Sequence, residues 1–162
     1  MARVYVSVGS NVQREEKIPS CIRALREAFG SLLVSTVYQT QAVGFAGDDF
    51  FNLAVGFDTD EEVRTLVAHL RNIEVAHGRR YDAPKFSART LDLDLLLYDD
   101  LVQESGGLQL PRDEITRYAF VLCPLAEIAG ERSHPILGVT FAELWEAFDQ
   151  EREPLYPVSL KL

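Results

Sequence analysis

The stretch Arg89-Thr90-Leu91-Asp92-Leu93-Asp94-Leu95-Leu96-Leu97-Tyr98 alternates leucines with two aspartates along its first half. In an extended strand, successive side chains point to opposite faces of the sheet. The pattern therefore predicts a strand from about residue 91 to 98, with the two aspartates together on one face. The leucines expected on the other face are Leu91, Leu93, Leu95 and Leu97.

Two neighbouring carboxylates on a half-buried strand repel each other and resist desolvation, and a cation between them relieves both effects. Oxygen ligands suit Mg²⁺, which binds one or two carboxylates together with water and substrate phosphates. Basic residues that could hold phosphate precede the strand: Arg79, Arg80, Lys85 and Arg89. The combination favours a nucleotide-handling enzyme. The alternative is an exposed strand whose acidic residues only keep the surface soluble.

The composition predicts one globular domain spanning residues 1–162, since 47% of the residues are hydrophobic and 25% are charged. A net charge of −9 argues against nucleic-acid binding and fits a local basic site for a small phosphorylated ligand. Cys21 and Cys123 lie in apolar helical patterns and are expected to be small buried side chains. With no signal-peptide pattern or membrane-spanning stretch in the sequence, we expect a cytoplasmic protein with no membrane partner.

Along the chain, the predicted elements up to and including this strand follow the order β-α-β-β-α-β, which is the ferredoxin-like arrangement of an α+β fold. Thr59 and Glu62 form a capping-box pattern ahead of the second helix. The chain then adds two C-terminal helices and a tail that is extended or loosely ordered. The expected strands are 4–8, 32–39, 50–57 and 91–98, the helices 14–29, 59–78, 118–128 and 140–148, the main loop 40–49 and the tail 151–162.

The sequence resembles the hydroxymethyl-dihydropterin pyrophosphokinase family in an ordered series of motifs over nearly its whole length. The series begins with Tyr5-Val-Ser-Val-Gly-Ser-Asn11 and is strongest in Ile73-Glu74-x-x-x-Gly78-Arg79 followed by Arg89-Thr-Leu-Asp92-Leu-Asp94. The remaining matches are Tyr38-Gln-Thr40, Gly44, Phe51-Asn-Leu-Ala54, Pro111 and Ala119-Phe120-Val-Leu-x-Pro124-Leu-x-Glu127-Ile-Ala129. Each motif alone is weakly specific, whereas the ordered set is specific.

The resemblance implies transfer of the pyrophosphoryl group of ATP to a pterin hydroxymethyl oxygen, with release of AMP, by a monomer. By the same resemblance, Asp92 and Asp94 would hold two Mg²⁺ ions on the triphosphate, and Arg79 and Arg89 would grip its oxygens. Rate enhancement would come mainly from positioning and electrostatics, because the nucleophile belongs to the substrate.

The family's pterin-binding positions correspond to an amide, a loop and aromatic side chains of this chain. Asn52 could pair with the edge of the pterin ring, although an amide in a strand can also face solvent. Phe50 and Phe120 could stack on the ring, and ordinary core packing is the alternative for both. The loop positions that would complete the pairing are Thr40, Val43 and Gly44.

The nucleotide side departs from the family pattern at several positions. Tyr81 stands where a second arginine is usual, Arg112 where a histidine follows the proline, and Tyr118 where an arginine precedes the helix motif. The residues expected to bind nucleotide in this chain are Glu74, Arg79, Arg80, Phe86, Arg89, Arg112 and Arg117. For Glu74, the alternative is a solvated helix residue paired with Arg71 or Arg79.

Two main hypotheses follow for the activity, beside a third possibility, a related phosphotransferase that acts on a different pterin or nucleotide. The first is an active Mg²⁺- and ATP-dependent pyrophosphokinase of folate biosynthesis. The second is a pterin-binding or regulatory paralogue with weakened or altered nucleotide use, which the clustered departures favour.

Overall fold

The computed structural model describes residues 1–41, 49–79 and 91–162 of the chain. Within these ranges the fold is mixed α and β, with four α-helices and one large antiparallel sheet. The elements in chain order are β1 (Ala2–Ser10), α1 (Arg14–Phe29), β2 (Leu33–Val34), β3 (Val37–Thr40), β4 (Phe50–Thr59), α2 (Val63–Ala76), β5 (Asp92–Tyr98), β6 (Gln103–Ser105), β7 (Leu108–Leu110), the 3-10 helix η1 (Asp113–Thr116), α3 (Ala119–Ala129), α4 (Phe141–Ala147) and β8 (Tyr156–Val158).

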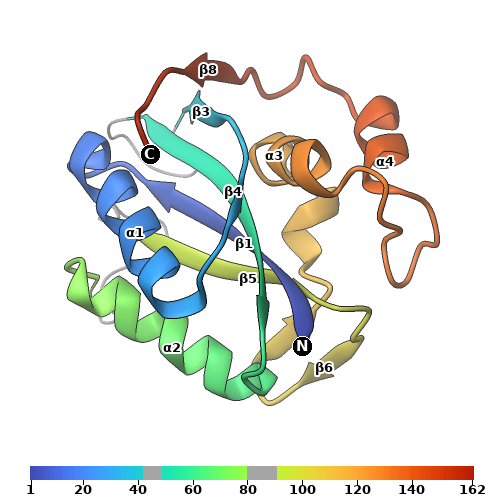
Figure 1. The fold of residues 1–162 in the computed structure, drawn as a ribbon. Helices are drawn as coiled ribbons and strands as arrows, with labels where there is room; N and C mark the ends of the chain where they lie inside the picture. Colours follow the sequence, from blue (N-terminus) through green and yellow to red (C-terminus); the bar gives the residue numbers. More distant parts are fainter. Residues whose placement is uncertain (42–48, 80–90) are drawn as a thin grey trace.

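The large sheet has the strand order β5-β1-β4-β3-β8, and β2 pairs with β4 beside β3. Helices α1 and α2 cover one face of the sheet, while α3 and α4 lie on the other side (Figure 1). The larger apolar core lies under α1 and α2 and includes Val4, Val6 and Val8 of β1. The smaller core packs α3 and α4 against Tyr5 and Leu97. The sheet is therefore buried on both faces, but by cores of unequal size.

A bulge in β5 changes which leucines share a face. Tyr5 pairs with Leu97, whereas the next residue of β1, Val6, pairs with Leu95, so Leu96 is an extra residue in β5. One inserted residue moves every later side chain to the other face. Leu91, Leu93 and Leu95 join the larger core as predicted, but Leu97 joins the smaller one, and the prediction for Leu97 is wrong.

The predicted strand 32–39 is divided into β2 and β3 around Ser35. The backbone N–H of Ser35 donates to the Ala54 carbonyl (3.0 Å), and its hydroxyl accepts from the Ala54 N–H (2.9 Å). The Ser35 hydroxyl thus takes the place of a backbone acceptor for Ala54, at the point where the pairing with β4 is interrupted between β2 and β3.

The ends of the helices partly match the sequence patterns. Helix α1 has the predicted bounds, and Gly30 follows it with φ 83°, a conformation that glycine adopts without strain. Helix α2 is capped by Glu62, whose carboxylate accepts from the N–H groups of Arg64 and Thr65, so the capping box predicted from Thr59 is wrong. A complete capping box does occur at α4, between Thr140 and Glu143.

Four short elements differ from the predicted order: β6, β7, η1 and β8. The hairpin β6–β7 turns through Gly106 and Gly107, both with positive φ. The 3-10 helix η1 follows it, and the C-terminal tail forms β8, which pairs with β3. No helix in the described ranges is long and apolar enough to span a membrane.

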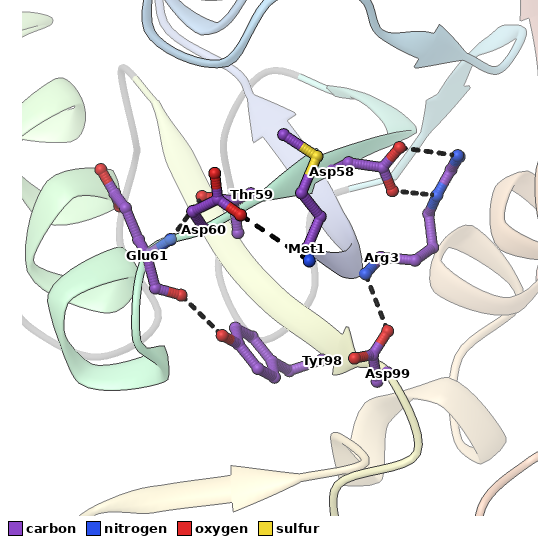
Figure 2. A network of polar contacts seen from close by, with 8 residues as sticks. All are labelled: Met1, Arg3, Asp58, Thr59, Asp60, Glu61, Tyr98 and Asp99. Carbon is purple, nitrogen blue, oxygen red and sulfur yellow. Dashed lines mark hydrogen bonds and ion pairs between the residues drawn. The ribbon is translucent and has the colours of Figure 1, made fainter.

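A polar network joins the ends of three adjacent strands, β1, β4 and β5 (Figure 2). It lies at the Tyr98 end of β5, opposite the end where Asp92 begins the strand. The backbone N–H of Arg3 donates to the Asp99 carboxylate (2.8 Å), and its guanidinium pairs with Asp58 (2.8 Å). The Tyr98 hydroxyl donates to the Glu61 carbonyl (2.6 Å). These contacts tie the neighbouring ends of β1, β4 and β5 to one another.

Candidate active site

The register of three adjacent strands brings the two aspartates and Asn52 to one face of the sheet. Gly9 of β1 pairs with Asn52 of β4 on one side and with Asp92 of β5 on the other. Residues directly opposite each other in an antiparallel pair share a face, and neighbouring strands lie about 4.8 Å apart. The Cα atoms of Asn52 and Asp92 are therefore about 10 Å apart, across one glycine.

Gly9 lies at the centre of this row, and sequence reasoning missed its importance. The sequence predicted a strand break at residues 9–11, but β1 continues to Ser10. A Cβ atom added at Gly9 would come within 3.0 Å of the Asn52 Oδ1. A glycine inside a strand often marks such a close approach, and this signal could have identified the position. The absent side chain lets the Asn52 amide lie close against β1 at this point.

Asp92 and Asp94 stand on the same face, as their spacing predicted, and both side chains are partly buried. Burial, followed by repulsion from Asp92, raises the pKa of the Asp94 carboxyl to about 7. A cation would relieve this unfavourable interaction. The described ranges contain no group of three or more His, Cys, Asp or Glu side chains suited to a metal ion. A carboxylate pair with open ligand positions suits Mg²⁺ that is shared with water and phosphate.

Each aspartate is paired with an arginine. Arg79 lies just after the end of α2, and its Nη1 donates to the Asp92 Oδ1 (3.1 Å). Only 13% of the Arg79 side chain is exposed. The Arg112 Nη2 lies 3.5 Å from the Asp94 Oδ1. Both arginines were predicted to bind nucleotide. The structure brings both of them to the carboxylate pair.

Glu74 fastens the end of α2 to the start of β5. Its side chain is 4% exposed, and its Oε2 accepts from the Leu93 N–H (2.8 Å), between the two aspartates. Its carbonyl accepts from the Arg79 N–H (3.0 Å). The alternative of a solvated helix residue is therefore wrong. Glu74 orients the backbone that carries Asp92, Asp94 and Arg79.

Asn52 is a buried amide with a partner. Its side chain is 5% exposed, and its Nδ2 donates to the Thr40 Oγ1 on β3 (2.8 Å). This burial rules out the alternative of a solvent-facing strand residue. The partly buried ring of Phe50 lies in the same region, with its Cδ1 3.9 Å from the Cβ position of Gly9. Thr40, Phe50 and Asn52 thus lie together on β3 and β4, on the opposite side of Gly9 from Asp92.

Two of the other predicted residues, Phe120 and Arg117, make contacts away from the Asn52–Gly9–Asp92 row, and the rest lie outside the described ranges. The Phe120 ring, in the first turn of α3, stacks on Tyr118 with centroids 5.1 Å apart. Arg117 is 65% exposed and forms its described ion pair with Asp113 rather than with Asp94. The predicted residues that fall outside the described ranges are Val43, Gly44, Arg80, Phe86 and Arg89.

Glu127 was part of a recognised motif, but its contacts were not predicted. Its carboxylate on α3 accepts from the Thr36 N–H (2.6 Å), the Thr36 hydroxyl (3.0 Å) and the Tyr38 hydroxyl (2.8 Å). These bonds fasten α3 to β3, the strand that carries Thr40. Motif position alone gave no signal of this, because the partners are about 90 residues apart in sequence.

The sequence model described as 7,8-dihydro-6-hydroxymethylpterin-pyrophosphokinase (HPPK) matches residues 5–130. The chain belongs to the HPPK family. The matched range includes Asn52, Gly9 and Asp92, the three residues of the row. The HPPK match ends at Gly130, so α4 and β8 lie beyond it.

Curated HPPK relatives support the same assignment. The chain is 33% identical to a 2-amino-4-hydroxy-6-hydroxymethyldihydropteridine pyrophosphokinase of Aquifex aeolicus, over 84% of this chain and 86% of the relative. It is 34% identical to the enzyme of the same name from Pseudomonas aeruginosa, over 82% of this chain and 84% of the relative.

Solved structures agree at the level of the fold. The wild-type HPPK-DHPS of Plasmodium falciparum superposes with a TM-score of 0.69 at 13% identity, over 90% of this chain. This chain spans 41% of that longer chain. At such low identity, the likeness concerns the arrangement of the backbone.

Proposed function

We infer that this chain transfers the pyrophosphoryl group of ATP to the hydroxymethyl group of 6-hydroxymethyl-7,8-dihydropterin, a step of folate biosynthesis. Membership of the HPPK family and the names of its curated relatives support this activity. The single observation that carries it to this chain is the row Asn52–Gly9–Asp92, which sets a buried amide beside a carboxylate pair that has arginine partners.

In the proposed reaction, the hydroxymethyl oxygen attacks the β-phosphorus of ATP. A new oxygen–phosphorus bond forms, the bond from the β-phosphorus to the α-phosphate oxygen breaks, and AMP leaves with that oxygen while the hydroxyl proton is released. Asp92 and Asp94 are the residues that would hold Mg²⁺. Bound there, the ion would neutralise charge on the triphosphate and align it for in-line attack.

The protein's own part is to hold the two substrates in line. Arg79 and Arg112 already lie at the carboxylate pair, within reach of a triphosphate bound there, and guanidinium groups suit phosphate oxygens. Asn52, supported by Thr40, offers an amide edge to the pterin, and Phe50 and Phe120 offer ring faces. We propose the same substrate-binding roles for Val43, Gly44, Arg80, Phe86, Arg89 and Arg117.

We also propose a ferredoxin-like core in a single domain, working as a cytoplasmic monomer. The antiparallel order β5-β1-β4-β3, with both crossover helices on one face, supports the ferredoxin-like assignment. Two free cysteines suit a reducing compartment. Light scattering during gel filtration would test the monomer, since a mass of twice 18.2 kDa would refute it.

The test of the activity is pterin-dependent release of AMP. Purified protein with ATP, Mg²⁺ and hydroxymethyl-dihydropterin should form AMP, and Asp92→Ala should lose turnover while it keeps the circular-dichroism spectrum of the parent. Full turnover in Asp92→Ala would refute the metal assignment. Pterin binding by calorimetry without AMP would instead favour a pterin-binding paralogue.

A further inference from the structure

Arg112 is held beside β5 by its own backbone. Its N–H donates to the Leu96 carbonyl (3.0 Å), at the extra residue of the β5 bulge. This bond places the Cα of Arg112 next to the strand, two residues along from Asp94. The side chain therefore reaches the carboxylate pair from a fixed point.

The guanidinium of Arg112 bridges two carboxylates with unequal contacts. The Nε lies 2.9 Å from the Glu114 Oε2 in an ion pair, and both atoms are buried, although their geometry is not that of a hydrogen bond. The Nη2 lies 3.5 Å from the Asp94 Oδ1, beyond the usual range of a hydrogen bond. The contact with Glu114 is thus the close one, and the contact with Asp94 is the one that can be exchanged.

Arg79 and Arg112 differ in how freely they can move. The Arg79 side chain is 13% exposed and donates a hydrogen bond to Asp92, whereas the Arg112 side chain is 35% exposed. A guanidinium and a divalent cation repel each other, so they cannot both sit close to one carboxylate oxygen. A metal ion that arrives alone therefore competes with Arg112 for Asp94 without offering the guanidinium another anion.

We propose that Arg112 is a positioning residue that neutralises Asp94 in the empty site and exchanges Asp94 for a phosphate oxygen when a nucleotide brings the metal ion. Glu114 keeps the guanidinium at the site during the exchange. This inference rests on the proposed function, because it assigns the incoming anion to a nucleoside triphosphate. Metal and nucleotide binding are then coupled, and linkage requires that each strengthens the other.

The test measures metal binding without nucleotide and without turnover. Mn²⁺ is titrated into the metal-free protein and the free ion is followed by electron paramagnetic resonance. Arg112→Gln should bind Mn²⁺ about tenfold more tightly than the parent, since a charged competitor for Asp94 is gone. Arg112→Lys, which retains the charge, should stay within about threefold of the parent.

The matched control is Arg3→Gln, which removes an arginine paired with a carboxylate at the far end of the same three strands. It should leave Mn²⁺ affinity unchanged. The second measurement is calorimetric binding of Mg²⁺ with α,β-methylene-ATP, whose carbon bridge replaces the oxygen at the bond that breaks. Arg112→Gln should bind this analogue about tenfold more weakly than the parent.

Unchanged or weaker Mn²⁺ binding by folded Arg112→Gln would overturn the exchange and leave Arg112 as a plain structural or phosphate contact. Tighter Mn²⁺ binding with undiminished analogue binding would overturn the second half, in which Arg112 moves to phosphate. Neither result depends on turnover. Pterin-dependent AMP release by the parent protein therefore tests the proposed function separately.

Discussion

At the scale of single residues, the site uses side chains whose burial is unfavourable without a partner. Glu74, Asn52 and Asp94 are polar groups on or beside buried strands. Glu74 and Asn52 have hydrogen-bond partners within the protein. Among the described residues, Asp94 has the loose contact with Arg112 described above and the like charge of Asp92 beside it. Its carboxylate is therefore the group most in need of a ligand from outside the chain.

We predict that Asp94→Asn stabilises the metal-free protein at alkaline pH while it removes turnover. The pKa of this carboxyl is raised from 3.8 to about 7 by burial and by Asp92. Between these values the folded state holds a proton that the unfolded state has released, so the free energy of unfolding falls as pH rises. The asparagine variant lacks this loss.

Because Asp94 is partly exposed, the gain should be only about 1 kcal/mol at pH 8, and it should vanish near pH 4. Urea unfolding with EDTA at both pH values measures it. A variant less stable than the parent at pH 8 would show that Asp94 is stabilising in the empty site.

For single residues, the sequence pattern predicted which side chains share a face, but it did not predict which of them are buried or what they contact. The alternation around Asp92 and Asp94 was enough to place both on one face. It could not show that Glu74 is buried against Leu93, because that contact joins a helix to a strand 19 residues away. Tertiary burial, rather than helical spacing, decides the role of such a residue.

At the scale of elements, the sheet register decides what the site contains. The bulge at Leu96 lets β5 serve the larger core with its first leucines and the smaller core with Leu97. A run of three leucines gives no sign of where the alternation changes phase, so the bulge was not predictable. Gly106-Gly107, by contrast, was a readable hairpin signal for β6–β7.

We predict that Glu127→Gln loosens the attachment of α3 to β3. The neutral amide loses the charge that strengthens three hydrogen bonds from Thr36 and Tyr38. Since Glu127 is exposed at the surface, the free energy of unfolding should fall by about 1 kcal/mol. Pterin affinity should also fall, because β3 carries Thr40.

Urea unfolding and pterin calorimetry test both effects. The control is Glu131→Gln, the same change on an exposed residue just after α3. Equal behaviour of the two variants would mean that the Glu127 contacts do not support the site.

At the scale of the whole molecule, the sheet joins two cores, and its far edge is covered by the C-terminal strand. β8 pairs with β3 through Val37 and Val158. Val158, Leu160 and Leu162 also pack against the larger core, although they are only partly buried. The sequence predicted an extended or loosely ordered tail, and three residues with a proline gave no indication of a strand partner.

We predict that removing residues 156–162 destabilises the protein and promotes self-association. Partial burial of three apolar side chains is lost, which should lower the free energy of unfolding by roughly 3 kcal/mol. The freed edge of β3 presents unpaired backbone groups that a second molecule can pair with. Urea unfolding and sedimentation velocity measure the two effects.

The control is Tyr156→Ser, on an exposed side chain of β8, which should change the free energy of unfolding by less than about 0.5 kcal/mol. A truncated protein as stable and as monomeric as the parent would show that β8 only rests on the sheet, and that β3 and its Thr40 are held by β4 and Glu127 alone.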